Sequence, residues 1–162
     1  MKKYLRIFML LFFISFGFSS YAAQGDANSL KTAPAFQLAD LNDKIVSLSD
    51  YKGKKAVILF FWTTWCPYCR AELKTLNAKS ADLAKASVVL LAVNVGETKD
   101  KAANFVKSRN LSFEILLDKD SQVTELYDLL GVPTYFVINK SGEVVSTENH
   151  FPENFIKELS SK

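Results

Sequence analysis

The chain has 162 residues, of which 49% are hydrophobic and 23% are charged. A chain of this length and composition can bury the core of one compact domain without disulfide cross-links. Its formal net charge is +3. Lys2, Lys3 and Arg6 near the N-terminus contribute three positive charges, so the rest of the chain is neutral. A neutral domain gives no reason to expect nucleic acid or anionic lipid as a partner.

Residues 1–22 have the anatomy of a secretory signal peptide. The three basic residues precede an apolar run at residues 7–18, and Ser20 and Ala22 form an A-x-A-like cleavage site. This run is shorter than the roughly 20 apolar residues that a membrane-spanning helix needs. We expect cleavage after Ala22 and a soluble mature protein in the bacterial periplasm or at the extracytoplasmic face, with an uncleaved N-terminal membrane anchor as the alternative.

The mature chain begins with a polar stretch and continues with strand patterns. Residues 23–33 lack hydrophobic periodicity and predict a flexible leader, so the folded domain is expected to span residues 34–162. Alternating apolar residues on both sides of a turn at residues 40–43 predict a β-hairpin. The segment AVILFFW at residues 56–62 is apolar throughout, as in a strand that is covered on both faces. We expect it to be the central strand.

Helices and strands alternate through the rest of the chain, which predicts an α/β domain with a mixed sheet. The middle of this sheet is expected to be parallel and its last hairpin antiparallel. The predicted elements are a helix from about Cys66 or Pro67 into the low eighties, a strand at 88–95, a helix at 99–109, a strand at 113–117, a helix at 121–130, a strand at 135–138, a turn at 140–142, a strand at 144–145 and a helix at 152–159.

Both cysteines of the chain lie directly after the predicted central strand, in FFWTTWCPYC. A cross-link between Cys66 and Cys69 would close a tiny loop and remove little entropy from the unfolded chain, so stabilisation is a poor explanation for it. Disulfide exchange needs one thiolate that attacks and a second thiol that displaces the mixed disulfide. We therefore interpret the pair as reactive.

The predicted helix start assigns different roles to the two thiols. At the helix N-terminus, free N–H groups and the helix dipole favour a thiolate on Cys66. Cys69, one turn further, is expected to be less exposed and to act as the resolving thiol. Zinc sites use the same spacing but usually have four Cys or His ligands. The chain offers only His150 besides the two cysteines, and we interpret it as a surface residue, so no metal is expected.

The segment FFWTTWCPYCRAEL resembles the active-site segment of thioredoxin-fold proteins of the TlpA and ResA type. The similarity continues through FQLADLNDKIVSLSDYKGK and GVPTYFVINKSGEVV and covers about residues 34–160. It implies a thioredoxin-like α/β fold, with a central mixed β-sheet flanked by helices, an N-terminal β-hairpin and an inserted β-α unit. It further implies an extracytoplasmic thiol:disulfide oxidoreductase, most often a reductant of protein disulfides, including those of apocytochromes c.

The same resemblance places a cis proline at Pro133, facing the disulfide. The backbone of Val132 would then be free to pair with an extended substrate segment by strand addition. The structural alternative is a rigid turn that starts the next strand. The resemblance therefore makes Val132 and Pro133 candidate substrate-binding residues.

Glu72, three residues after Cys69, lies where these proteins carry an acidic residue near the sulfurs. The resemblance suggests that it relays protons or tunes the thiol pKa values, whereas the alternative is a solvated carboxylate in the first half of a helix. Ordinary thioredoxin has a buried acid six residues before its first cysteine, but that position here is Phe60. Glu72 is therefore expected to be the only acid near the cysteines that can transfer protons.

The aromatic residues around the motif divide into surface and core. Trp65 is expected to shield Cys66 and to offer apolar surface to a partner, together with Pro67 and Tyr68 between the cysteines. The Pro-Tyr pair is better known from glutaredoxins, which leaves the redox potential open. Trp62, like Phe60 and Phe61, is interpreted as core.

The residues therefore favour an enzyme that exchanges dithiols for disulfides in protein substrates, with the Cys66–Cys69 disulfide as its only redox group. A reductant would need a membrane-bound thiol donor to regenerate it, while the reverse direction would make it an oxidase. Thr63 and Cys66 have the T-x-x-C spacing of peroxiredoxins, but Leu59 stands where that motif carries proline. A peroxidase and a non-catalytic binding module are the remaining alternatives.

Overall fold

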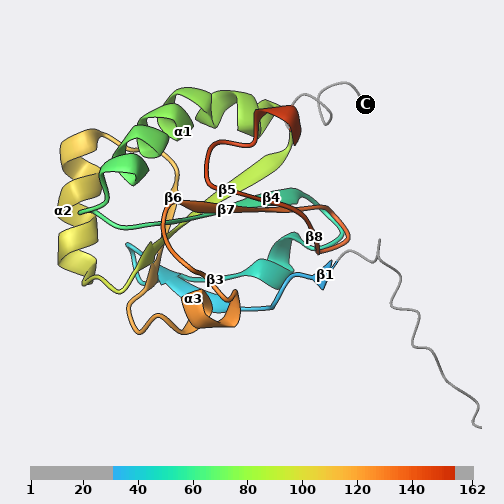
Figure 1. Ribbon diagram of the computed structural model, residues 1–162, viewed down its shortest axis with the longest axis horizontal. Coiled ribbons are helices and arrows are strands. Elements are labelled where there is room, and N and C mark those ends of the chain that lie inside the picture. The colour runs from blue at the N-terminus through green and yellow to red at the C-terminus, as the bar shows by residue number, and fades with distance from the viewer. Residues whose placement is uncertain (1–30, 156–162) are drawn as a thin grey trace, which may run out of the picture.

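The computed structural model describes residues 31–155, so the predicted signal peptide and most of the predicted leader lie outside the described residues. These residues form one mixed sheet with helices on both faces (Figure 1). The elements are β1 (Lys31–Thr32), β2 (Gln37–Asp40), β3 (Ile45–Ser47), the 3-10 helix η1 (Leu48–Tyr51), β4 (Ala56–Trp62), α1 (Pro67–Lys85), β5 (Val88–Val95), α2 (Lys99–Arg109), β6 (Glu114–Asp118), α3 (Gln122–Leu126), β7 (Thr134–Ile138) and β8 (Glu143–Glu148).

The sheet of the described residues has the strand order β1-β8-β7-β4-β5-β6-β2-β3. Strand β5 pairs in parallel with both β4 and β6, whereas every other neighbouring pair is antiparallel. Helix α2 and strand β6 form a strand-and-helix unit between β5 and the N-terminal hairpin β2–β3. The predicted thioredoxin-like fold, with its parallel middle and antiparallel last hairpin, is confirmed.

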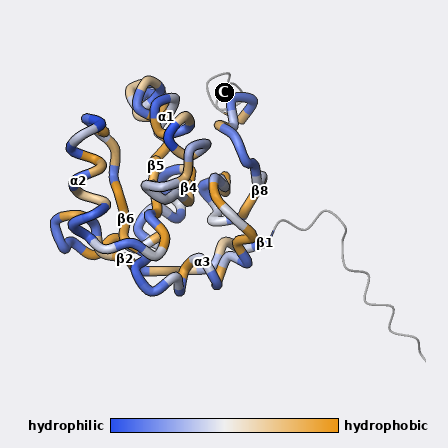
Figure 2. Tube along the Cα trace, turned by 60° about the vertical axis from the view of Figure 1, so that its left-hand side comes forward, coloured by the Kyte–Doolittle hydropathy of each residue, from blue (hydrophilic) through white to orange (hydrophobic). Residues whose placement is uncertain are grey.

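Strand β4 lies in the middle of the sheet because all seven of its side chains can be buried. Side chains alternate between the two faces of a strand, so Phe60 and Trp62 enter one core and Leu59 and Phe61 enter the other. Burying each such side chain stabilises the fold by roughly 1.5–3 kcal/mol. Figure 2 shows the apolar strands β4 and β5 enclosed by more polar helices.

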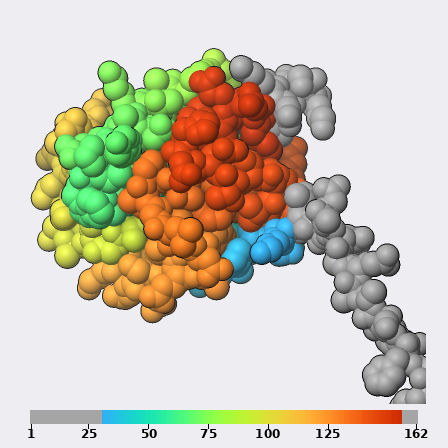
Figure 3. All heavy atoms as spheres, viewed as in Figure 1, coloured from blue at the N-terminus to red at the C-terminus, as the bar shows by residue number. Residues whose placement is uncertain are grey.

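Each face of the sheet is covered by different segments. Leu73, Leu76 and Leu83 of α1 cover one face, together with Phe105 of α2 and Phe151 after β8. The segment around Phe151 lies against α1 in the space-filling view (Figure 3). The opposite face is covered by η1, by α3 and by the N-terminal hairpin (Figure 1). The predicted core positions Phe60, Phe61 and Trp62 are all fully buried.

Helix α1 begins where the sequence predicts it, because Pro67 occupies its first turn, where no N–H is needed. It ends near Ser87, which has a left-handed φ of 57°. Helix α2 begins at the N-cap Thr98, whose hydroxyl accepts a hydrogen bond from the N–H of Lys101, and it ends at Asn110 in the left-handed conformation. Both helices are therefore delimited by local capping residues.

Several segments differ from the sequence-based expectations. Lys31 and Thr32 pair with β8 and Ala33 is buried, so the sheet begins inside the segment that we expected to be a flexible leader. Helix α3 ends at Leu126 instead of residue 130, because Asp128 adopts a left-handed φ of 49°. Residues 153–155 are helical, while the rest of the helix predicted at residues 152–159 lies outside the described residues.

Candidate active site

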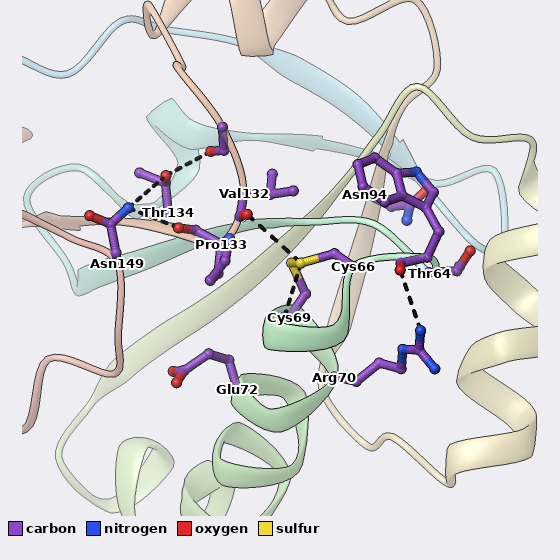
Figure 4. The surroundings of a disulfide bond; sticks show 12 residues. Thr64, Cys66, Cys69, Arg70, Glu72, Asn94, Val132, Pro133, Thr134 and Asn149 are labelled. Carbon is purple, nitrogen blue, oxygen red and sulfur yellow. Dashed lines mark hydrogen bonds between the residues drawn. A yellow bond between two sulfur atoms is a disulfide. The ribbon is translucent and has the colours of Figure 1, made fainter.

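Cys66 and Cys69 form a disulfide at the start of α1, with their Cα atoms 5.2 Å apart (Figure 4). Strand β4 ends at Trp62, and a three-residue loop leads from it to Cys66, the N-cap of α1. The backbone N–H of Cys69 donates to the sulfur of Cys66 over 3.1 Å. The helix therefore presents an N–H donor and the positive end of its dipole to the first sulfur.

The two sulfur-bearing residues differ in exposure. Cys66 is 3% exposed and Cys69 is 0% exposed, so the first cysteine is the one nearer to solvent. This is the order predicted for an attacking and a resolving thiol. The part of the disulfide-bonded pair that is exposed therefore belongs to Cys66.

The loop before β7 faces the disulfide. The Val132–Pro133 peptide bond is cis, as the resemblance implied. The carbonyl oxygen of Val132 lies 3.7 Å from the sulfur of Cys66 (Figure 4). The amide of Asn149 donates to the carbonyl of Pro133 over 3.0 Å, and the hydroxyl of Thr134 donates to a carbonyl in the same loop over 2.8 Å. These side chains hold the loop, and neither was recognised in the sequence.

Glu72 is half-buried on α1, one turn beyond Cys69. Its carboxylate accepts a hydrogen bond of 2.7 Å from the hydroxyl of Tyr135 on β7. Tyr135 is fully buried and stacks on Phe60 with 4.5 Å between ring centroids. Burial raises the pKa of Tyr135, and the hydrogen bond and negative charge of Glu72 raise it further, so the phenol stays protonated. The neutral hydroxyl of Tyr135 thus positions Glu72. The sequence had predicted Tyr135 only as part of a strand.

Glu97 is a second acid near the cysteines, only 6% exposed, in the turn after β5. It accepts hydrogen bonds from the N–H and the hydroxyl of Thr64, both at 2.7 Å, and from the amide of Asn94 at 2.8 Å. Lys101 forms an ion pair with it at 2.8 Å. Burial raises the pKa of Glu97, but the bonds from Lys101, Asn94 and Thr64 together outweigh burial and lower it. Glu97 is therefore held as a carboxylate.

The expectation that Glu72 is the only acid near the cysteines that can transfer protons stays a prediction, and the structure adds Glu97 as a second acid close to the motif. Glu97 anchors Thr64, which lies two residues before Cys66, and so fixes the loop from which α1 starts. One signal in the sequence pointed to this position. Asn94 interrupts the apolar run of β5 and Glu97 follows the strand directly, and polar groups at the carboxyl ends of parallel strands gather at one edge of a sheet.

Large apolar side chains surround the disulfide on the surface. Trp65 is 65% exposed, Tyr68 is 77% exposed and Leu130 is fully exposed, and Pro67 is exposed as well. A hollow of about 660 Å³ is lined by Tyr68 and Leu130 but not by Trp65 or Pro67, and its lining also includes Glu72, Val132, Pro133 and His150. The structure therefore gathers the predicted contact residues Tyr68, Val132 and Pro133 at one opening. His150 is exposed, as expected.

Two further properties concern the described part of the chain. Within residues 31–155, no group of three or more His, Cys, Asp or Glu side chains is placed to hold a metal ion. In the same range, no helix combines the length and the apolar character that crossing a bilayer requires.

A disulfide at a helix start, with one cysteine nearer to solvent and the other buried behind it, provides both sulfurs that an exchange reaction needs. The fold and this site define the chain as a thiol:disulfide oxidoreductase with a thioredoxin-like fold. Residues 30–147 match the model of the AhpC/TSA family, and the chain belongs to that family.

Relatives with the predicted activity cover most of the chain. The thiol-disulfide oxidoreductase ResA of Bacillus subtilis is 38% identical over 154 residues, which are 90% of this chain and 86% of that protein. ResA of Geobacillus thermodenitrificans is 38% identical over 153 residues, which are 89% and 87% of the two chains. The crystal structure of StoA from Bacillus subtilis has a TM-score of 0.67 at 28% identity and covers 79% of this chain and 97% of StoA. The resemblance to the ResA type and the enzyme class are confirmed.

Proposed function

We propose that the protein reduces disulfide bonds of partner proteins outside the cytoplasm. The observation that carries this proposal is the sulfur of Cys66, which receives the N–H of Cys69 at the helix start while Cys69 itself is buried. In the reduced enzyme the same N–H and the helix dipole stabilise a thiolate on Cys66. The accessible sulfur is then the nucleophile.

The reaction consists of two exchanges. The Cys66 thiolate attacks one sulfur of the substrate disulfide, a mixed disulfide forms, and the other substrate sulfur leaves as a thiolate that takes up a proton. Cys69 then loses its proton and attacks the sulfur of Cys66, which releases the second substrate thiol. Two electrons pass to the substrate, and the enzyme ends with the Cys66–Cys69 disulfide. A membrane-bound thiol donor regenerates the dithiol, and no other cofactor is required.

Glu72 is proposed to take the proton that Cys69 loses in the second exchange. Its place on α1, one turn beyond Cys69, and its contact with the opening beside the disulfide support this role. The hydrogen bond from Tyr135 keeps the carboxylate in one orientation. Glu72 therefore acts as a base whose position is set from β7.

The loop of Val132 and Pro133 is proposed to bind the substrate. An extended segment pairs with the backbone of Val132, as in strand addition to a sheet edge. Trp65, Pro67 and Tyr68 cover the segment from the other side. Their large exposed fractions support this role, because exposed apolar side chains gathered around a reactive group are typical of an interaction surface.

Two features of the sequence support the proposed location and substrate class. The predicted signal peptide supports export, and the resemblance to the ResA type supports apocytochromes c among the substrates. The direction of electron flow is tested by equilibrating the purified protein with glutathione buffers. We expect a reduction potential close to the roughly −270 mV of thioredoxin, and a value near the roughly −120 mV of DsbA would replace the reductant with an oxidase.

A further inference from the structure

A second depression lies on the other side of the disulfide from the loop of Pro133, between α1 and α2. We call it the α1–α2 cleft. It has a volume of about 220 Å³ and an apolar floor made by Leu73, Phe105 and Leu111. Leu73 is buried, and the other two pack partly buried against the same core. A floor of this kind accepts one apolar side chain of a partner.

The edge of the α1–α2 cleft is positively charged. Arg70, Lys74 and Arg109 line it together with Asn77, and no acidic residue does. Within residues 31–155, none of these three cations forms an ion pair. Three cations without an ion-pair partner produce a local positive potential, although the charges of the domain as a whole balance.

Two of the cations are held in place by contacts of their own. The guanidinium of Arg109 lies 5.5 Å from the ring centroid of Phe105, within the range of a cation–π interaction. The guanidinium of Arg70 donates to the carbonyl of Trp65 over 3.3 Å. Figure 4 shows Arg70 on the side of the disulfide opposite Pro133. The positive edge therefore begins directly beside the reacting sulfurs.

We infer that the α1–α2 cleft docks an acidic segment of the protein substrate, with one apolar side chain of that segment on the floor. The inference rests on the proposed function, because a partner held at Cys66 extends over Arg70 and reaches the cleft. An inorganic anion would leave the apolar floor uncovered, whereas an acidic peptide segment satisfies both the floor and the three cations. Charges at the edge of an interface mainly select the partner and speed its approach.

The test uses two synthetic peptides that contain the same intramolecular disulfide. One continues with aspartates and glutamates around a single leucine, and the other has lysines in place of the acids. The wild-type protein is expected to reduce the acidic peptide about fivefold more efficiently at low ionic strength, since each exposed charge pair contributes little by itself. The preference is expected to shrink as salt screens the charges.

Charge reversal identifies the surface. The double variant Lys74→Glu/Arg109→Glu is expected to reverse the preference, so that the lysine peptide becomes the better substrate. Lys107→Glu reverses one charge on α2 at an exposed residue that does not line the cleft, and it is expected to leave the preference unchanged. Equal kcat/KM values for both peptides in the wild type, or an equal effect of Lys107→Glu, would overturn the inference.

Binding of the same peptides with serine in place of both cysteines separates this inference from the proposed function. Fluorescence anisotropy of labelled peptides is expected to show tighter binding of the acidic one, lost in the double variant. If neither disulfide peptide is reduced but this binding pattern holds, the reductant proposal fails and the docking surface stands. If both peptides are reduced but bind equally, the docking surface fails and the reductant proposal stands.

Discussion

Glu97 and Thr64 are joined by two hydrogen bonds of 2.7 Å, one from the backbone N–H and one from the hydroxyl of Thr64. Hydrogen bonds to an ionised carboxylate are stronger than those between neutral groups. They connect the turn after β5 to the loop that carries Cys66. The position of the helix start relative to the sheet therefore depends on a carboxylate in the turn after β5.

Replacing Glu97 with alanine is expected to weaken both the fold and the site. The change leaves the N–H of Thr64 and the amide of Asn94 without their acceptor, and unsatisfied buried groups cost about 1–3 kcal/mol. Urea unfolding measures this loss, and stopped-flow exchange with a small disulfide measures the reactivity of Cys66, which should fall. Glu125→Ala, at an exposed position on α3, serves as the control. Equal unfolding midpoints for the two variants would contradict the role of Glu97.

The stability of the fold is expected to fall on acidification because the Glu97 carboxylate becomes protonated. The folded-state pKa of Glu97 lies below its usual value of 4.5, so the unfolded chain binds the proton more tightly than the folded one. The stabilisation by Glu97 is therefore complete above about pH 4.5 and is lost as the pH falls through the folded-state pKa. The difference in unfolding free energy between wild type and Glu97→Gln should shrink over that range.

Asp40 is another carboxylate whose titration changes the stability of both the wild type and Glu97→Gln at acidic pH. Burial raises its pKa, but hydrogen bonds from the backbone of Lys44 and Asn42 lower it below its usual value. Asp40 titrates in both proteins and therefore cancels from the difference. Parallel stability curves for wild type and Glu97→Gln between pH 6 and the acid transition would show that Glu97 is not the group responsible.

The sequence predicted those parts of the protein that depend on local patterns. An uninterrupted apolar run identified β4, and Pro67 after the first cysteine identified the start of α1. The role of Glu97 could not be predicted from the sequence, because its partner Thr64 is 33 residues away and becomes its neighbour only when β4 and β5 pair in parallel. The hydrogen bond from the hydroxyl of Tyr135 to Glu72 could not be predicted for the same reason, since the two residues are 63 positions apart. Polar networks between distant segments have no periodic signal in one sequence.

Tyr135→Phe is expected to affect proton transfer from Cys69 to Glu72 more than it affects the stability of the fold. The ring keeps its stacking on Phe60, and Glu72 is half-buried and can bind water in place of the lost hydroxyl. Loss of this hydrogen bond should cost about 0.5–1.5 kcal/mol. If Glu72 accepts the proton of Cys69, the pH dependence of the resolving step, measured from decay of the mixed disulfide, should shift.

Tyr127→Phe is the matched control for that experiment. Tyr127 is also buried, and its hydroxyl donates to the carbonyl of Pro34 over 2.8 Å on the other face of the sheet. It should lose comparable stability without any shift in the pH profile. A shift of the same size in both variants would assign the effect to general loosening of the domain.

Asn149→Ala is expected to impair protein substrates selectively. Asn149 donates to the carbonyl of Pro133, so its loss loosens the loop that is proposed to pair with a substrate segment. A small disulfide needs no such pairing and should react with Cys66 at the wild-type rate. The ratio of kcat/KM for a peptide disulfide to that for a small disulfide should therefore fall several-fold. An unchanged ratio would remove the loop from substrate binding.

Cysteine variants separate catalysis from simple binding. Cys66→Ser should abolish exchange, because Cys69 is fully buried and cannot reach a partner. Cys69→Ser should still attack but cannot resolve, so partner proteins should accumulate as mixed disulfides on Cys66 that non-reducing electrophoresis detects and reductant releases. A binding module without catalysis would keep its function in Cys66→Ser and trap nothing in Cys69→Ser. Since each trapped partner is bound to Cys66 through a cysteine of the disulfide that was attacked, mass spectrometry of the adducts also identifies the substrates.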